Sequence, residues 1–254
     1  MLKFRKMFCI VFILFLIVSI SKSRSQSFLE EQRSYSKVKL AFDEKENDLL
    51  LEISQLGINN NSFEIFLRAF KKEKILEVWI KNKTDEFYTL FKKYDFCSFS
   101  GDLGPKRKEG DLQIPEGIYF INHFNPLSSF FLSLGINYPN ESDKILSDQE
   151  RPGGEIYIHG GCATIGCIPI TDDRIKELYI LAVLAKSFGQ NKICVHIFPT
   201  KLERQNYLIL KIQNLFKKSL CEFWDNLKPI YLYFEENKKI PQTKVQSNGK
   251  YIIE

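Results

Sequence analysis

Apolar and polar residues alternate along several short segments of the first half of the chain. In residues 76–80 the side chains of Leu76, Val78 and Ile80 fall on one face, the period-two pattern of a half-buried strand. The same pattern, bounded by glycine- and proline-rich breaks at 101–105 and 115–117, predicts further strands. The expected strands are 63–70, 75–80, 88–92, 96–99, 118–121, a short run at 156–158, and a closing strand at 193–197.

Helical periodicity replaces this alternation in three other segments. Residues 28–56 are charged with interspersed Leu and Ile, which predicts one or two leading helices. Thr171 has the character of an N-cap, and Asp172 and Asp173 suit the first turn of a helix that continues to Gly189. Residues 201–238 are helical in pattern and precede a loose final strand. The polar insert at 125–154 shows no period, which predicts a lid or wall facing a substrate.

These elements predict a mostly β core with one packed α-helix between helical N- and C-terminal extensions, α+β overall. The chain begins with a basic start, Lys3 to Lys6, followed by an apolar run that ends at Ile20 and then by serines. This is the composition of a signal peptide, and the run is short of the about 20 residues that a membrane span needs. We therefore expect residues 1–23 to be a signal peptide, with an uncleaved N-terminal anchor as the alternative.

Charge and cysteine content narrow the function. The formal net charge is +5, but the leader holds four basic residues and no acidic one, so the rest of the chain is near +1. That value argues against nucleic acid as a partner. The lysine clusters at 71–74 and 106–108 are expected to be solvated turns.

Five of the six cysteines remain once Cys9 leaves with the leader, so at least one thiol of the exported chain is unpaired. Cys97, Cys162, Cys194 and Cys221 are too few and too scattered to predict a disulfide framework. The odd number fits a chain that keeps Cys167 for chemistry.

The most informative segment is 155–167, where an apolar run leads into a glycine-containing loop that ends at Cys167. The run delivers His159, and the loop contains Gly160, Gly161 and Gly166. An imidazole beside a thiol can accept its proton or stabilise its thiolate. We therefore predict Cys167 as a nucleophile with a lowered thiol pKa, and His159 as its base within about 3–4 Å of the sulfur. The second ring nitrogen of His159 is expected to face a backbone carbonyl or another acceptor.

Two further roles are predicted in this loop. The backbone N–H of Cys167, with a neighbouring amide, is expected to form an oxyanion hole. Gly160, Thr164 and Gly166 are expected to support the loop, with the Thr164 hydroxyl bracing it.

His159-Gly160 followed by Thr164-Ile165-Gly166-Cys167 resembles the signature of the L,D-transpeptidase catalytic domain, the YkuD family, and is closest to its YafK-type branch. Further motifs of the resemblance stand in the same order along the chain. They are residues 100–106, 109–111, 115–117 and 170–172, and more loosely 223–224, 226–228, 233–235 and 248–251.

The resemblance implies a YkuD-like β-sandwich or barrel and an enzyme of the periplasm or cell envelope that modifies peptidoglycan. Its expected domains are a helical lead-in at 28–60, a catalytic domain at 62–200 and a helical C-terminal extension at 201–254. The resemblance also implies that Cys167 attacks the carbonyl at the L-centre of a diaminopimelate-type residue in a stem peptide and forms a thioester. No cofactor or metal is expected.

The acceptor of that acyl group stays open. Typical family members place Arg two residues after the cysteine and a second His just before Gly-Cys, where this chain has Pro169 and Ile165. An activity of the YafK-type branch is hydrolysis that releases a peptidoglycan-linked lipoprotein, so hydrolysis is slightly favoured over cross-linking. Because stem peptides carry carboxylates, Lys106 and Arg107 are candidate substrate-binding cations, with Tyr138 as a packing wall.

Several alternatives use the same residues. A zinc site would combine Cys162, Cys167, Cys194 and His196, at unfavourable spacing. Otherwise Cys162 is expected to be a small buried residue, or else a regulatory disulfide partner of Cys167. His196 is expected to be packed core and His123 polar surface. A non-catalytic peptidoglycan-binding protein on the same scaffold is the alternative function.

Overall fold

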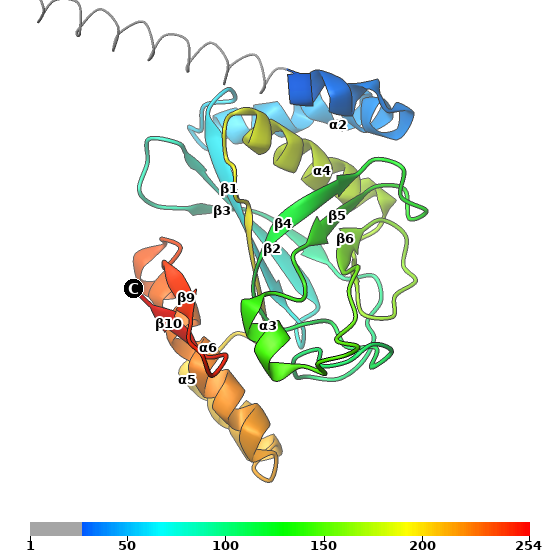
Figure 1. Ribbon diagram of the computed structural model, residues 1–254. Coiled ribbons are helices and arrows are strands. Elements are labelled where there is room, and N and C mark those ends of the chain that lie inside the picture. The colour runs from blue at the N-terminus through cyan, green and yellow to red at the C-terminus, as the bar shows by residue number, and fades with distance from the viewer. Residues whose placement is uncertain (1–26) are drawn as a thin grey trace, which may run out of the picture.

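The computed structural model describes residues 27–254, so the predicted leader at 1–23 lies outside the described residues. A curled eight-stranded sheet forms its centre, in the order β3-β2-β1-β8-β4-β5-β6-β7 (Figure 1). The pairs β1–β8 and β6–β7 are parallel, and the other neighbours are antiparallel. The strands are β1 (Phe63–Phe70), β2 (Ile75–Asn82), β3 (Thr89–Asp95), β4 (Gly117–Asn125), β5 (Ser133–Ile136), β6 (Tyr157–His159), β7 (Ile168–Pro169) and β8 (Cys194–Phe198).

The two edges of this sheet meet at one end. Cys97, just after the edge strand β3, donates its backbone N–H to the carbonyl of Pro169 in the other edge strand β7, at 3.0 Å. A disulfide between Cys97 and Cys162, which are 65 positions apart, joins the same two edges covalently. The sheet is therefore a half-barrel that is fastened where β6 and β7 meet the end of β3.

The helix α4 (Asp172–Ser187) covers one face of the sheet, and α2 (Ser36–Gln55) packs on the side of α4 that faces away from the sheet (Figure 1). Helical residues 27–34 precede α2. The main hydrophobic core joins buried side chains of β1, β2, β4, β5, β6, β8, α2 and α4. Because α4 is covered by the sheet on one side and α2 on the other, most of its residues are buried and it has little amphipathic character. None of the described helices is long and apolar enough to cross a membrane.

The C-terminal extension folds as a helical hairpin followed by a small β-hairpin. It consists of α5 (Arg204–Gln213), α6 (Lys218–Asn237), β9 (Thr243–Val245) and β10 (Tyr251–Ile253). Its root packs Trp224 and Tyr231 of α6 against Phe70 of β1 and Phe198 of β8. The root also holds a buried ion pair between Lys71 and Glu116 at 3.0 Å, and Glu116 accepts a hydrogen bond from the Trp224 indole at 2.7 Å.

The α+β prediction is confirmed, and the strand at 63–70 has its predicted bounds. The predicted strand at 96–99 is wrong, because the amides of Phe96 and Cys97 bond to the separate carbonyls of Lys74 and Pro169 and no partner strand runs alongside. The insert at 125–154 contains β5 and a short helix, α3 (Glu141–Leu146), which the sequence did not predict.

Two local predictions need correction. Thr171 occupies the N-cap of α4, but its side chain makes no capping hydrogen bond and its φ is 70°. Lys71 is not solvated, because it is fully buried with Glu116 and two backbone carbonyls, and this burial lowers the pKa of its ammonium. The pattern of residues 63–70 did not predict that Lys71, directly after β1, is buried.

Candidate active site

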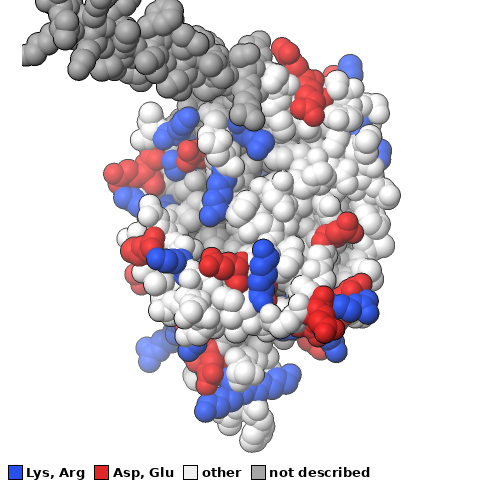
Figure 2. Space-filling model, viewed as in Figure 1, with Lys and Arg blue, Asp and Glu red and all other residues white. Residues whose placement is uncertain are grey.

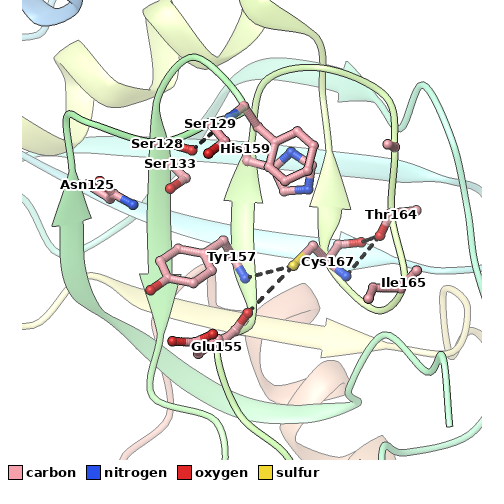
Figure 3. A pocket seen from close by; sticks show the side chains of 12 residues that line it. Asn125, Ser128, Ser129, Ser133, Glu155, Tyr157, His159, Thr164, Ile165 and Cys167 are labelled. Carbon is pink, nitrogen blue, oxygen red and sulfur yellow. Dashed lines mark hydrogen bonds between the residues drawn. The ribbon is translucent and has the colours of Figure 1, made fainter. Parts of the chain in front are cut away.

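A cavity of about 510 Å³ opens at the β6–β7 edge of the sheet (Figure 3). It brings together Cys167, His159, the start of the β6 segment and the loop between β4 and β5. Its lining consists of Asn125, Ser128, Ser129, Phe130, Ser133, Glu155, Tyr157, His159, Ala163, Thr164, Ile165 and Cys167.

The strand register explains why His159 and Cys167 face the same cavity. In the parallel pair β6–β7, Ile158 lies beside Ile168 and His159 beside Pro169. Cys167 directly precedes β7 and lies level with Tyr157, whose amide hydrogen approaches its sulfur. Since side chains alternate across a strand, Tyr157, His159 and Cys167 project from one face, while Ile158 and Ile168 enter the core. Figure 3 shows the His159 ring and the Cys167 sulfur on the same side of these strands.

The loop between the two residues is braced by Thr164. Its hydroxyl donates to the Cys167 carbonyl at 2.8 Å and accepts from the amides of Gly166 at 3.2 Å and Cys167 at 2.9 Å. A Cβ at Gly160 would lie 2.5 Å from an Asp172 carboxylate oxygen and 2.7 Å from the Phe130 carbonyl. Thr164 therefore holds the loop by hydrogen bonds, and position 160 has no room for a side chain.

The thiol of Cys167 contacts backbone groups. The Tyr157 N–H donates to its sulfur at 3.4 Å, and the sulfur lies 3.7 Å from the Glu155 carbonyl oxygen. Burial raises the pKa of the thiol, the Tyr157 amide and the positive charge of Lys106 oppose that shift, and the negative charge of Glu155 adds to it. The prediction of a lowered thiol pKa is wrong for this structure, because the imidazole is not among the groups that act on the thiol.

His159 is buried and its ring packs on Phe130, with 4.5 Å between the ring centroids and 32° between the ring planes. Its Nδ1 contacts the Gly160 carbonyl oxygen, as expected for the nitrogen that faces away from the nucleophile. Burial lowers the pKa of the imidazole, and the carbonyl contact opposes that shift. The ring is therefore neutral near pH 7, with its proton on Nδ1 and a free electron pair on Nε2. The structure records no hydrogen bond between Nε2 and the Cys167 sulfur, and the two groups share the cavity, so the expected distance between them stays a prediction.

The comparisons with known proteins agree with this geometry. The sequence profile of the L,D-transpeptidase catalytic domain, YkuD, matches residues 67–193, which span the sheet from β1 to the start of β8 and include His159 and Cys167.

The chain belongs to the L,D-transpeptidase family.

The family protein YafK of Escherichia coli strain K12 is 35% identical to this chain over 191 residues, which cover 74% of this chain and 73% of YafK. The same figures hold for YafK of Escherichia coli O157:H7. This L,D-transpeptidase-family chain is therefore an enzyme that acts on peptidoglycan.

Two solved structures share a weaker likeness. The helical cell shape determining protein Pgp2 from Campylobacter jejuni has 19% identity and a TM-score of 0.43, with 77% of this chain and 79% of Pgp2 covered. Bd1075 of Bdellovibrio bacteriovorus has 21% identity and a TM-score of 0.37, with 66% of this chain and 59% of Bd1075 covered. These scores are too low to carry an argument about fold or function.

The structure of this L,D-transpeptidase-family chain corrects the expected oxyanion hole. The Cys167 amide is already bonded to the Thr164 hydroxyl at 2.9 Å. The same hydroxyl also accepts the Gly166 amide, so neither N–H points into the cavity without a partner. The Thr164 hydroxyl thus occupies the Cys167 N–H that was expected to stabilise an oxyanion.

The predicted substrate-binding residues do not line the cavity. Lys106 is buried and pairs with Asp111 at 2.6 Å, so the expected solvated turn is wrong at this position. Arg107 pairs with Asp143 at 3.2 Å. Tyr138 is buried and donates its hydroxyl to the Pro152 carbonyl at 2.8 Å. Of the three, Lys106 retains a link to the chemistry, because its charge favours the Cys167 thiolate.

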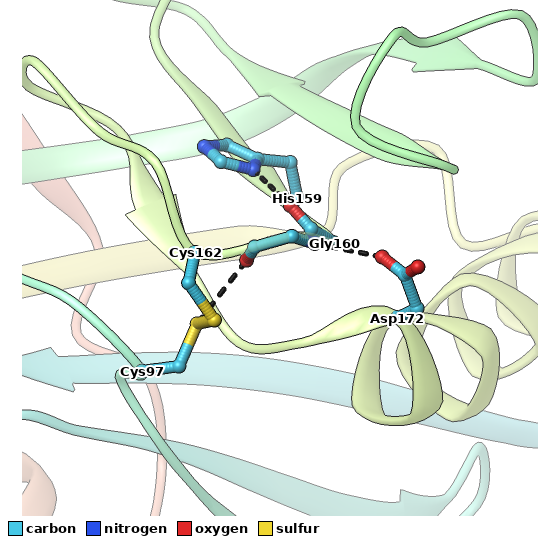
Figure 4. The surroundings of a disulfide bond; sticks show 6 residues. Cys97, His159, Gly160, Cys162 and Asp172 are labelled. Carbon is cyan, nitrogen blue, oxygen red and sulfur yellow. Dashed lines mark hydrogen bonds between the residues drawn. A yellow bond between two sulfur atoms is a disulfide. The ribbon is translucent and has the colours of Figure 1, made fainter.

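Cys162 is bonded to Cys97 (Figure 4), so the predicted buried thiol, the regulatory disulfide with Cys167 and the zinc alternative at Cys162 are all wrong. Cys162 is exposed. The Cys97 sulfur also lies 3.1 Å from the Gly161 carbonyl oxygen. Asp172, at the start of α4, accepts the Gly161 amide at 2.7 Å. No group of His, Cys, Asp and Glu side chains within residues 27–254 is arranged to hold a metal.

The remaining histidines lie as predicted. His196 is packed core, 1% exposed, between the rings of Phe66 and Phe198. His123 is exposed on β4 and meets the Tyr157 ring edge-on. Sequence reasoning missed Glu155 and Phe130 as cavity residues. Glu155 is the first residue of the segment 155–167, and Phe130 lies in the insert 125–154 that was expected to form a wall of the site. The sequence therefore indicated both segments but not these two residues.

Proposed function

We propose that Cys167 is the nucleophile and His159 the general base of an acyl transfer on peptidoglycan stem peptides. The observation that carries this proposal is the shared cavity, into which a thiol and a neutral imidazole both project from adjacent strands. The contact of Nδ1 with the Gly160 carbonyl supports it, because it leaves Nε2 as the proton acceptor.

The proposed reaction conserves protons at each step. His159 Nε2 takes the thiol proton as the Cys167 sulfur attacks the carbonyl at the L-centre of a diaminopimelate-type residue. The C–N bond then breaks, and the imidazolium returns the proton to the departing amine, which leaves a thioester on Cys167. Attack by water or by an amine, with His159 again taking the proton, releases the acyl group and restores the thiol.

Because burial raises the pKa of the thiol and lowers that of the imidazole, both groups are neutral at rest. The proton therefore moves during attack and not before it. The nearby charge of Lys106, held in place by Asp111, favours the developing thiolate. In this proposal Lys106 acts on the sulfur through space and does not bind the substrate carboxylates.

We propose water as the principal acceptor, so that the enzyme acts as an amidase that releases protein linked to peptidoglycan. Two features support this choice. The chain is similar to YafK and lacks the second His and the Arg that the wider family places beside the cysteine. In addition, no Lys or Arg lines the cavity, while the Glu155 carboxylate does, which suits the ammonium of a lysine side chain as it departs. Such an enzyme would work in the cell envelope.

Mass spectrometry of the purified protein after incubation with tetrapeptide stems and with lipoprotein-linked stems tests the proposal. We expect an acyl adduct on Cys167 and release of the linked protein, both absent from Cys167→Ala. Cross-linked dimers without released protein would replace hydrolysis by transpeptidation. Retained turnover in Cys167→Ala would contradict the nucleophile. A thiol-directed acylating reagent that labels no cysteine selectively would favour the non-catalytic alternative.

A further inference from the structure

The helical hairpin of the C-terminal extension carries an apolar face that nothing in the described chain covers. The face consists of Leu208, Ile209 and Ile212 of α5 and continues through Leu215 and Phe216 in the turn before α6. Positions three and four apart lie on one side of a helix, so these residues form a continuous stripe. Phe216 is 99% exposed, and we call this stripe the hairpin tip.

The hairpin tip is held out from the domain by polar contacts on the opposite side of α5. Lys211 bonds to Asp225 of α6 at 2.6 Å, and Tyr207 bonds to the same carboxylate. Leu210 points into the core formed with α6. Because α5 uses these residues to pack on α6, its apolar stripe faces away from the protein. Figure 1 shows the α5–α6 turn at the end of the hairpin, remote from the sheet.

The charges around the tip indicate what covers it. Residues 201–222 contain five basic and two acidic residues, whereas the chain beyond the predicted leader is close to neutral. Lys217 and Lys218 follow Phe216 directly, and the Lys218 side chain is 91% exposed although its ammonium lies 4.0 Å from the Glu222 carboxylate. In Figure 2 the lower end of the molecule is uncharged, with Lys and Arg just above it. An apolar end with cations behind it is the arrangement of a segment that enters the interface of an anionic bilayer.

We propose that the hairpin tip docks on an anionic membrane surface, with Phe216 and Leu215 among the acyl chains and Lys217 and Lys218 at the headgroups. We favour a lipid surface over a partner helix because of Lys217 and Lys218. An apolar partner helix would cover the stripe without using these lysines, whereas anionic headgroups would pair with both. An isolated exposed apolar residue needs no explanation, but a continuous stripe that ends in a fully exposed Phe does.

A tryptophan introduced at position 216 reports on the tip independently of the N-terminal segment. In the full chain, Phe216→Trp is compared with Phe87→Trp, an exposed site on the loop before β3, against the constant background of the buried Trp79 and Trp224. With vesicles of equal parts phosphatidylglycerol and phosphatidylcholine, we expect the emission of the Phe216→Trp chain to shift to shorter wavelength and to be quenched by a lipid-borne quencher. The emission of the Phe87→Trp chain should stay unchanged.

Charge variants test the cations. In the Phe216→Trp chain, replacing Lys217 and Lys218 by Gln should weaken vesicle binding by about thirtyfold, whereas the same change at the exposed Lys93 and Lys108 should leave it unaltered. Unchanged emission of the Phe216→Trp chain on the anionic vesicles would overturn the proposal. So would equal binding to pure phosphatidylcholine vesicles, or a concentration-dependent dimer in sedimentation that Phe216→Glu abolishes, which would assign the stripe to a second copy of the chain.

Discussion

The surroundings of His159 and of His196 differ although both side chains are almost fully buried, at 2% and 1% exposure. His159 packs at a tilt on the Phe130 ring, has a carbonyl oxygen at Nδ1 and lines the cavity that holds Cys167. His196 meets Phe66 and Phe198 edge-on, and neither of its ring nitrogens has a hydrogen-bond partner in the described chain. Burial lowers the pKa of both, that of His196 to about 3, where the positive charge of Arg68 adds to the effect.

This difference separates burial from the two further features on which the proposed role of His159 as a base rests. Burial keeps both rings neutral, but only the carbonyl at Nδ1 of His159 fixes which nitrogen carries the proton. The cavity then gives the other nitrogen access to a thiol. The ring of His196 is also neutral, but no hydrogen bond in the described chain fixes its tautomer, and it does not line the cavity of Cys167. Its role is therefore to pack in the core.

The largest contrast should appear in activity. His159→Gln should lower kcat/KM for thioester formation by about 10²–10⁴, the usual contribution of a general base, while leaving the thermal unfolding temperature close to that of the parent. His196→Phe, at the other site, should leave kcat/KM within about threefold. Stopped-flow acylation with a stem-peptide substrate measures both variants. A greater loss in His196→Phe than in His159→Gln would invert the comparison.

Removal of the disulfide should give the largest change in stability. The Cys97–Cys162 bond closes a loop of 65 residues, for which the chain-entropy estimate is about 4 kcal/mol. The double variant Cys97→Ser, Cys162→Ser should lose a free energy of unfolding of that order in urea titration. Cys194→Ser, two residues from His196, is the matched control and should lose about 1 kcal/mol or less. Equal losses would show that the bond does not stabilise the sheet.

Acid should destabilise the His196 region selectively. The pKa of His196 is about 3 when folded and near 6.5 when unfolded, so below pH 6.5 the unfolded chain binds the extra proton and the free energy of unfolding falls. The contribution of neutral His196 to the free energy of unfolding is complete above pH 6.5, and about 2 kcal/mol of that free energy should be lost by pH 5. His196→Phe should flatten that part of the stability profile, measured by urea titration. His159→Gln should retain most of the slope, and an unchanged profile in His196→Phe would contradict the assignment.

The smallest predicted effect concerns the loop brace. Thr164→Val keeps the shape of the side chain and removes three hydrogen bonds around Cys167. We expect kcat to fall about tenfold with little change in KM, because the thiol is positioned less well once the loop loosens. Thr200→Val, which removes a buried hydrogen bond to Glu73 outside the cavity, should leave kcat unchanged. Similar kinetics for the two variants would assign Thr164 to stability alone.

Local patterns predicted β1, β2 and β8 close to their observed bounds, because these runs depend on neighbours in sequence, whereas the strand expected at 96–99 is absent and β5 was not predicted. The run 63–70 alternates and ends at lysines, and β1 has those bounds. Cys167 lies one position before β7 and level with Tyr157, so the parallel pairing of β6 and β7 brings His159 and Cys167 into one cavity.

Features that depend on distant contacts were not accessible in this way. Nothing near Cys97 points to Cys162, which it meets only after the sheet has curled. Lys71 looks like a surface lysine until Glu116, 45 positions away, pairs with it in the folded chain. Lys106 pairs with Asp111 only five positions away, so its burial depends on how this loop folds and not on a distant partner.

The closure of the sheet at Cys97 also has a consequence for the behaviour of the chain in concentrated solution. An open sheet offers two rows of unpaired backbone groups to which a strand from another molecule can add. Here the end of one edge strand covers part of the other, through the Cys97 amide and the disulfide to Cys162. A reducing environment would cleave the disulfide and loosen the contact at β7, next to Cys167, so that this edge could pair with another molecule. Formation of the disulfide therefore protects the edge beside the cavity against pairing between molecules.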